Sequence, residues 1–280
     1  MGSTPCPTPE TLAAFVAGVA CGNRIPQALM KYQTEMPLKF MYGGLAIGSI
    51  IGAFFYMGLV VILFAMGWFF LKQAYGEVSW PGWRGMPREY YRDALFIGVG
   101  GTAALLALAR TTEWAFGHWP TQHRAFPAAF GGDFDAFVPG VAIPAAAVLR
   151  GLAFAGLIAA ICGFILAHWK APLIRALLFL GVSVALVSGW GSPVDFLKQW
   201  LAELILLAAL VFGVTRIARM NLLGYFLVLA IPPLLLSLVA LLSQPNAYYQ
   251  QQGYLALAAL LALLAWPLAA WIAPEGRPAA

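Results

Sequence analysis

Residues 136–168 constrain this chain most, because these 33 consecutive residues contain a single fully charged side chain, Arg150. A helix needs only about 20 apolar residues to cross the hydrocarbon core of a bilayer. The whole chain of 280 residues is 62% hydrophobic and 10% charged, whereas soluble domains have about 25% charged residues. The sequence therefore predicts an all-α, polytopic integral membrane protein folded as a bundle of transmembrane helices.

Apolar segments recur along the chain, separated by short polar or aromatic connections. About seven transmembrane helices are expected over a domain at 40–273, after a soluble or interfacial segment at 1–39 and before a tail at 274–280. Pro232 and Pro233 predict a break in the sixth helix, because proline cannot donate a helical hydrogen bond. The predicted spans are 40–71, 94–116, 138–167, 173–190, 196–214, 222–242 and 254–273.

Lysine and arginine residues are distributed unevenly over the loops. Loops one, three and five, counted with the first residues of the spans that follow them, hold eight of them, and loops two, four and six, counted in the same way, hold two. Because cytoplasmic loops carry the excess of basic residues, we expect the C-terminus in the cytoplasm and the chain in the cytoplasmic (inner) membrane. The eight are Lys72, Arg84, Arg88, Arg92, Lys170, Arg175, Arg216 and Arg219, and the two are Arg124 and Lys198.

Of the charged residues inside the predicted spans, Arg150 in the third span and Glu203 in the fifth lie farthest from the span ends. Charges in the hydrocarbon region are costly and usually face a partner or a water-filled cavity. The rise of a helix places both in the outer half of the membrane, within reach of each other. The pair is interpreted either as a polar site for a substrate or proton, or as an ion pair that joins two helices. Simple snorkelling of the arginine is a third reading.

Glycine recurs at every fourth position in the first span, at Gly44, Gly48 and Gly52. Such spacing places the three glycines on one helix face, where the backbone of another helix can approach closely. We expect this face to pack against a helix, and we expect other membrane protein chains, along with lipid, to be the partners of this protein. The low density of basic residues gives no indication of nucleic-acid binding.

His168 lies at a predicted membrane edge, beside Trp169 and Lys170. A histidine in this position is either an ordinary interfacial residue or an axial ligand of haem or of a chlorophyll-like pigment. The identity of any cofactor stays open on the sequence alone. No spacing of His, Cys, Asp and Glu matches a zinc pattern, and no nucleophile sits beside a base in a recognisable catalytic pattern.

Five short motifs together resemble the membrane portion of large bacterial polytopic proteins. Some of those proteins are similar to the CAAX-protease and bacteriocin-processing family. The resemblance covers residues 30–273 and implies a helical bundle in a bacterial inner membrane. The motifs are Trp83-Arg84-Gly85-Met86-Pro87, Tyr90-Tyr91-Arg92-Asp93, Gly189-Trp190-Gly191-Ser192-Pro193, the stretch 221–227 and Gln244-Pro245-Asn246.

The catalytic motif of that protease family is Glu-Glu-x-x-x-Arg, and counting back from Arg150 places its two glutamates at Ala145 and Ala146. Without paired carboxylates the chain has no general base to activate water, so the resemblance implies an inactive relative. The leading hypothesis is a non-enzymatic scaffold or accessory subunit of a membrane assembly. The alternatives are a small-molecule or ion transporter that uses Arg150 and Glu203, and an inactive relative of an intramembrane protease.

Overall fold

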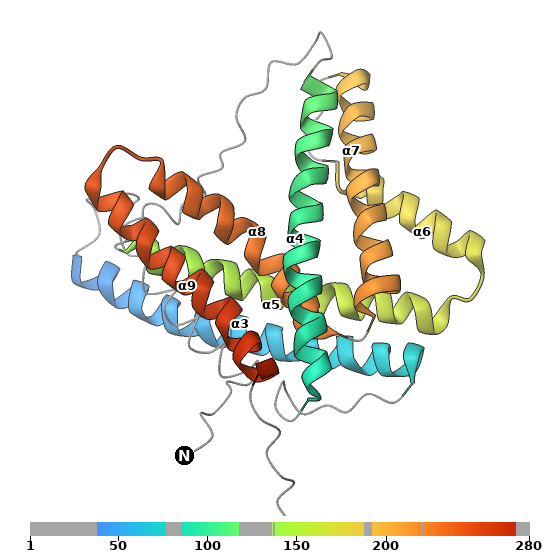
Figure 1. The fold of residues 1–280 in the computed structure, drawn as a ribbon, viewed down its shortest axis with the longest axis horizontal. Coiled ribbons are helices and arrows are strands. Elements are labelled where there is room, and N and C mark those ends of the chain that lie inside the picture. Colours follow the sequence, from blue (N-terminus) through green and yellow to red (C-terminus); the bar gives the residue numbers. More distant parts are fainter. Residues whose placement is uncertain are drawn as a thin grey trace, which may run out of the picture.

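The fold is helical throughout the part of the chain that the structure describes (Figure 1). The structure, a computed structural model, describes residues 38–76, 86–117, 136, 138–187, 192–219 and 221–272. The prediction of an all-α helical bundle is confirmed, because these residues form helices and contain no strand. The helices are α3 (Leu38–Tyr75), α4 (Arg88–Gly117), α5 (Pro139–His168), α6 (Pro172–Ala185), α7 (Pro193–Phe212), the π-helix η2 (Gly213–Ala218), α8 (Leu222–Leu242) and α9 (Ala247–Ile272).

Within the described ranges, six helices are long and apolar enough to cross a membrane. The helix at the predicted fourth span is shorter than expected, because α6 has 14 residues and therefore a length of about 21 Å. That length falls short of a hydrocarbon core of about 30 Å. The side of α6 is anchored on α7, where the indole N–H of Trp200 donates a hydrogen bond to the hydroxyl of Ser183 at 2.9 Å.

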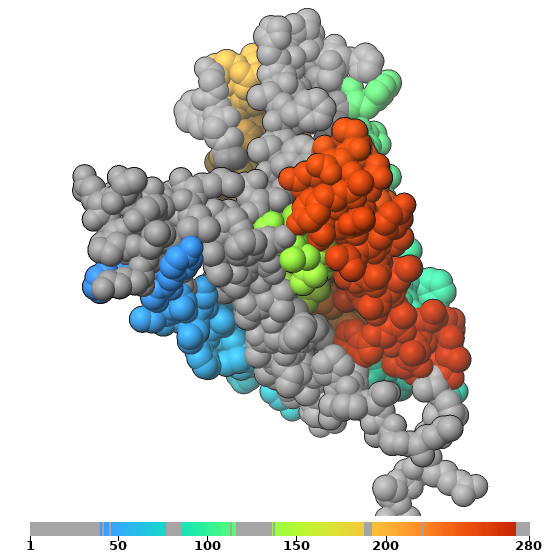
Figure 2. Space-filling model, turned by 90° about the vertical axis from the view of Figure 1, so that its left-hand side faces the viewer, coloured from blue at the N-terminus to red at the C-terminus, as the bar shows by residue number. Residues whose placement is uncertain are grey.

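Helix α5 occupies the centre of the bundle and contacts α3 on one side and α8 and α9 on the other. Its buried face consists largely of alanine and glycine. Helices α3 and α5 run side by side in the same direction (Figure 1). From another side, the start of α5 lies between α3 and the α8–α9 pair (Figure 2). Small side chains let these helices approach closely, and close packing is the main attraction between helices in lipid.

Glycine makes the contact between α3 and α5 possible at matched positions on both helices. A Cβ atom added at Gly156 of α5 would lie 2.9 Å from the backbone nitrogen of Phe64, and one at Gly163 would lie 2.9 Å from that of Leu71. A Cβ at Gly67 of α3 would lie 3.0 Å from the carbonyl oxygen of Gly156. These distances are too short for any side chain, so the three positions require glycine.

Helix α8 packs against α4 and α5 in the same manner. A Cβ at Gly98 of α4 would lie 2.6 Å from the Cβ of Leu227, and one at Gly151 of α5 would lie 2.8 Å from the Cβ of Ala230. The predicted break in this helix is wrong, because α8 is continuous from Leu222 to Leu242 with Pro232 and Pro233 inside it. Close packing of small residues on both sides holds the helix together where two backbone donors are missing.

Three connections of the chain meet at one end of the bundle. The hydroxyl of Tyr75 at the end of α3 donates to the carbonyl oxygen of Thr215 in η2 at 3.3 Å. The side-chain amide of Asn221 donates to the carbonyl oxygen of Tyr90 at the start of α4 at 2.9 Å, and the ring of His168 at the end of α5 contacts Phe70. The described parts of these three connections, which include Lys72, Arg92, Lys170, Arg216 and Arg219, therefore lie at the same end.

Candidate functional site

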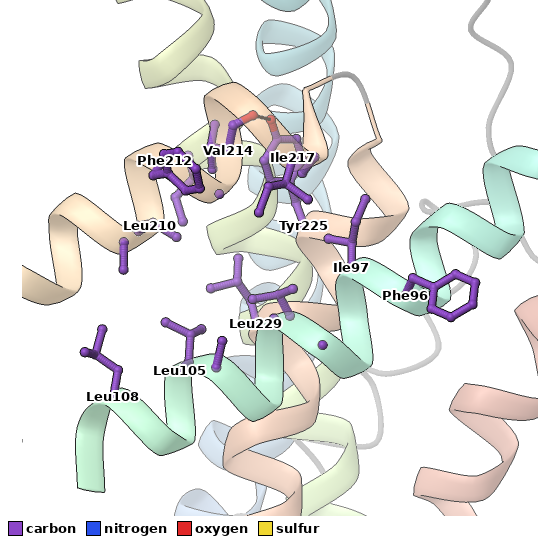
Figure 3. Close-up of a pocket in the computed structure, with 18 residues that line it drawn as sticks. Phe96, Ile97, Leu105, Leu108, Leu210, Phe212, Val214, Ile217, Tyr225 and Leu229 are labelled. Atoms are coloured by element: carbon purple, nitrogen blue, oxygen red, sulfur yellow. Dashed lines mark hydrogen bonds between the residues drawn. The ribbon is translucent and has the colours of Figure 1, made fainter. Parts of the chain in front are cut away.

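An apolar groove of about 620 Å³ lies between α4, α8 and the end of α7 with η2 (Figure 3). Helix α4 contributes one wall along its length, from Phe96 to Leu108. Leu210 and Ile217 line the opposite wall, and Leu229 lines the wall formed by α8. The lining has hardly any polar groups, so the groove can accept hydrocarbon but offers no site for acid–base chemistry.

The π-helix η2 shapes one end of this groove, since Val214, Ile217 and Ala218 belong both to η2 and to the lining. A π-turn is wider than an α-turn and is found most often at functional sites. Tyr225 holds the turn in place, because its hydroxyl donates to the carbonyl oxygen of Val214 at 3.3 Å and also to that of Arg219. Arg219 ends the turn with a φ of 42°, a backbone region that is strained for an arginine.

Two arginines lie next in sequence to the residues of η2 that line this end of the groove. Arg216 and Arg219 are both exposed, and neither lines the groove itself. The six residues of η2 contain no acidic side chain. Exposed positive charge therefore lies in and directly after the turn that shapes one end of the apolar groove.

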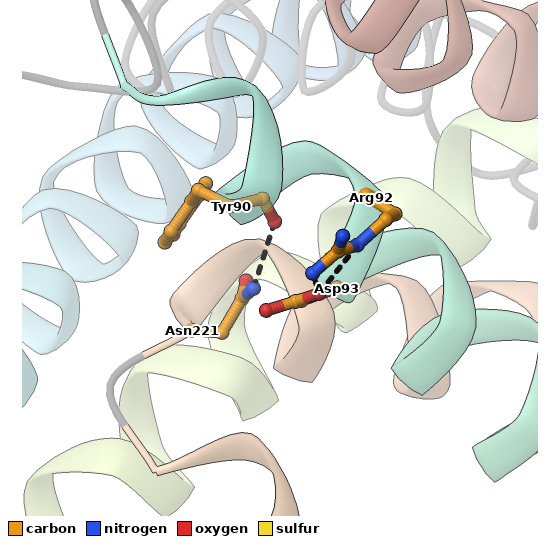
Figure 4. Close-up of polar contacts among 4 residues, drawn as sticks. All are labelled: Tyr90, Arg92, Asp93 and Asn221. Carbon is orange, nitrogen blue, oxygen red and sulfur yellow. Dashed lines mark hydrogen bonds and ion pairs between the residues drawn. The ribbon is translucent and has the colours of Figure 1, made fainter.

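A polar junction joins the start of α4 to the start of α8 beside this turn (Figure 4). The Oδ1 atom of Asn221 accepts a hydrogen bond from the backbone N–H of Gly224 at 2.9 Å, as expected of a helix N-cap. Its Nδ2 atom donates to Tyr90, whose hydroxyl accepts from the backbone N–H of Leu223 at 3.3 Å. The side chain of Asn221 is buried, so both of its hydrogen-bonding groups need these partners.

The exposed Arg92–Asp93 ion pair, at 3.0 Å, lies on the first turns of α4 near this junction. Exposed pairs between adjacent residues contribute little to stability. The sequence analysis used Asn221 and Tyr90 only as parts of motifs and missed their contact. An asparagine directly before an apolar run was the available signal for the helix cap, but nothing in the sequence indicates its partner on α4.

The predicted pair of Arg150 and Glu203 lies on two different helices of the bundle. Arg150 is exposed on α5, between the buried residues Leu149 and Gly151, and Glu203 is half-buried on α7. Neither residue lines the groove. An interaction between their side chains, and any transport role for them, stays a prediction.

His168 is exposed at the C-terminal end of α5, as the sequence predicts for an interfacial residue. Its ring stacks on Phe164 at 4.5 Å between centroids, and its Nδ1 atom lies 3.2 Å from the carbonyl oxygen of Phe164. Residues of the described ranges form no group of three His, Cys, Asp or Glu side chains that could hold a metal ion. A role for His168 as a haem or pigment ligand stays a prediction.

The glycine face of α3 lies on the half of the helix that α5 does not cover. Gly44 and Gly48 are exposed, and a Cβ atom added at either would meet no other atom within 4 Å. Gly52 follows on the same face and is half-buried. Large exposed side chains flank these glycines, among them Ile47 and Ile51 with 61% and 62% of their surface exposed. The face is a shallow strip between bulky apolar residues.

Ala145 and Ala146, at the positions of the protease glutamates, are buried in α5 among other small residues. They take part in helix packing and offer no polar atom beyond the backbone. Comparisons of the chain with protein-family models, curated proteins and solved structures found no match. The resemblance to the CAAX-protease and bacteriocin-processing family therefore stays a prediction from the motifs.

Proposed function

We propose that this protein is a non-enzymatic component of a membrane assembly that holds a transmembrane helix of another chain against the glycine face of α3, defined by Gly44, Gly48 and Gly52. The observation that supports this proposal most directly is the open space around Gly44 and Gly48, where an added Cβ atom would meet no atom within 4 Å. We also propose that the chain lies in the cytoplasmic membrane with the basic loop end and the C-terminus in the cytoplasm, because cytoplasmic loops carry the excess of lysine and arginine.

The glycines in the two halves of α3 have different surroundings, and this difference supports the proposal. In the second half, Gly67 brings α3 within reach of the backbone of α5. In the first half, Gly44 and Gly48 are exposed, and no helix among the described residues packs against them. Lipid tails do not drive helices together, but a glycine strip between bulky side chains allows close backbone contact with a second helix.

The transporter alternative needs a water-filled cavity that reaches Arg150 and Glu203. The groove described above is apolar and is lined by neither residue, so it gives that alternative no support. The other alternative, an inactive relative of an intramembrane protease, is itself non-catalytic, because alanine occupies both glutamate positions. The scaffold proposal requires only an exposed apolar surface on which another helix can pack, and the glycine face of α3 is such a surface.

Site-specific cross-linking in native membranes tests the proposal. A photoreactive amino acid at position 47, beside the glycine face, should give one discrete protein adduct, and the same probe at position 42 serves as the control. Tyr42 is also exposed on α3, with 49% of its surface free, but the helical repeat turns it away from the face of Gly44 and Gly48.

Gly48→Leu should abolish the adduct at position 47, because the new side chain fills the strip. An adduct of twice the protein mass would identify the occupant as a second copy of this chain. Equal labelling at positions 47 and 42, or an adduct that survives Gly48→Leu, would contradict the proposal.

A further inference from the structure

The groove between α4, α8 and η2 has dimensions that favour one kind of occupant. Its wall along α4 extends over 13 residues from Phe96 to Leu108, and the rise between the first and the last is about 18 Å. The lining along this length is almost wholly apolar. Its length and apolar character suit an extended hydrocarbon chain.

The floor of the groove is hollow because of one glycine. Gly100 lines the groove, and a Cβ atom there would meet no atom within 4 Å. Its neighbour Gly101 is different, since a Cβ there would lie 2.7 Å from Val228 of α8. Gly101 lets α4 and α8 meet closely, and Gly100 leaves space beside that contact.

Charge next to the lining residues of η2 indicates what the polar end of an occupant would be. Ile217 and Ala218 line the groove, and Arg216 and Arg219 flank them in sequence, both exposed. Guanidinium groups bind phosphate through paired, charge-assisted hydrogen bonds. Basic pockets between transmembrane helices on the cytoplasmic side are known sites for anionic lipid head groups.

We infer that the groove binds one acyl chain of an anionic phospholipid, with the lipid phosphate held by Arg216 and Arg219. The π-turn of η2 provides the junction between the two parts, because its residues Val214 and Ile217 face the groove while Arg216 belongs to the same turn. This inference goes beyond the proposed scaffold role and concerns a different surface of the protein.

Photolabelling in vesicles tests the inference with the full-length protein. The probe is phosphatidylglycerol that carries a photoreactive diazirine in one acyl chain, and phosphatidylcholine with the same chain is the comparison. Peptides from residues 96–108 and 210–229 should be labelled preferentially by phosphatidylglycerol. Gly100→Leu should reduce that labelling to the level of other lipid-facing peptides, because leucine fills the hollow.

The charge requirement is tested with Arg216→Gln, an exposed substitution that leaves packing intact. A basic side chain near the membrane surface contributes about 1 kcal/mol to binding of anionic lipid, so the preference for phosphatidylglycerol should fall about fivefold. Lys170→Gln, which removes an exposed cation elsewhere on the chain, should leave the preference unchanged.

Gly48→Leu separates this inference from the proposed function, because it should remove the α3 cross-link and leave lipid labelling of the groove intact. Equal labelling by both lipids, an unchanged preference in Arg216→Gln, or a polypeptide cross-linked within the groove would each overturn the inference.

Discussion

The side-chain amide of Asn221 donates to the carbonyl oxygen of Tyr90 at 2.9 Å, across 131 positions of the chain. This hydrogen bond ties the first turn of α4 to the cap of α8. It lies at the end of the bundle where η2 and the exposed Arg216 and Arg219 are also found. The position of the groove walls therefore depends on a polar contact that lies outside the groove itself.

Asn221→Ala should lower the free energy of unfolding by about 1–3 kcal/mol, because it removes a helix cap and the side-chain hydrogen bond to the carbonyl oxygen of Tyr90. Thermal unfolding in detergent measures the loss. Asn221→Ser is the matched variant, since serine can still cap α8 but is too short to reach Tyr90. Its stability should fall between those of the other two proteins, and a loss equal to that of Asn221→Ala would show that the contact with α4 dominates.

Gly156→Ala should destabilise the bundle by about 1–3 kcal/mol, as expected for an overpacked interior. The added methyl group would lie 2.9 Å from the backbone of α3, so the helices must separate. Gly181→Ala makes the same change on α6, where a Cβ atom meets nothing within 4 Å. The control should retain the midpoint of unfolding, and equal midpoints for both variants would contradict the close approach of α3 and α5.

Ser183→Ala should weaken the attachment of α6 to α7, since it removes the partner of the Trp200 indole N–H. The expected cost is about 1 kcal/mol, typical of one hydrogen bond. Limited proteolysis at the α6–α7 connection measures it, and the variant should be cut faster than the native protein. Ser243→Ala is the control, because that serine is exposed and bonds only to the preceding turn of its own helix.

The positions of six long helices follow from the sequence because apolar length alone determines whether a segment can cross a bilayer. The same criterion overestimated the length of the fourth helix, because apolar residues continue past Ala185, where α6 ends. Hydropathy measures the preference for oil and does not mark the end of a helix. The break expected at Pro232 and Pro233 failed for a related reason, because neighbouring helices hold the backbone of α8 together.

The spacing of the glycines in the sequence does not predict which of them pack against another helix. Gly44 and Gly48 have regular spacing but open surroundings, whereas Gly67 and Gly156 touch each other's helices without belonging to an obvious repeat. Contact depends on which helices lie side by side, and that is a property of the whole bundle. The groove could not be predicted from the sequence either, because the π-turn at 213–218 that shapes one end of it has no sequence signature.

Cysteine labelling from the two sides of the membrane tests the central claim most directly, namely that an oil-embedded bundle gathers its basic loops at one end. Single cysteines at Lys170 and Asn246 in a chain without its native cysteines would be treated with a membrane-impermeant maleimide in inverted and right-side-out vesicles. The account predicts that position 170 reacts only from the cytoplasmic side and position 246 only from the opposite side. Reaction of both positions from the same side would contradict it.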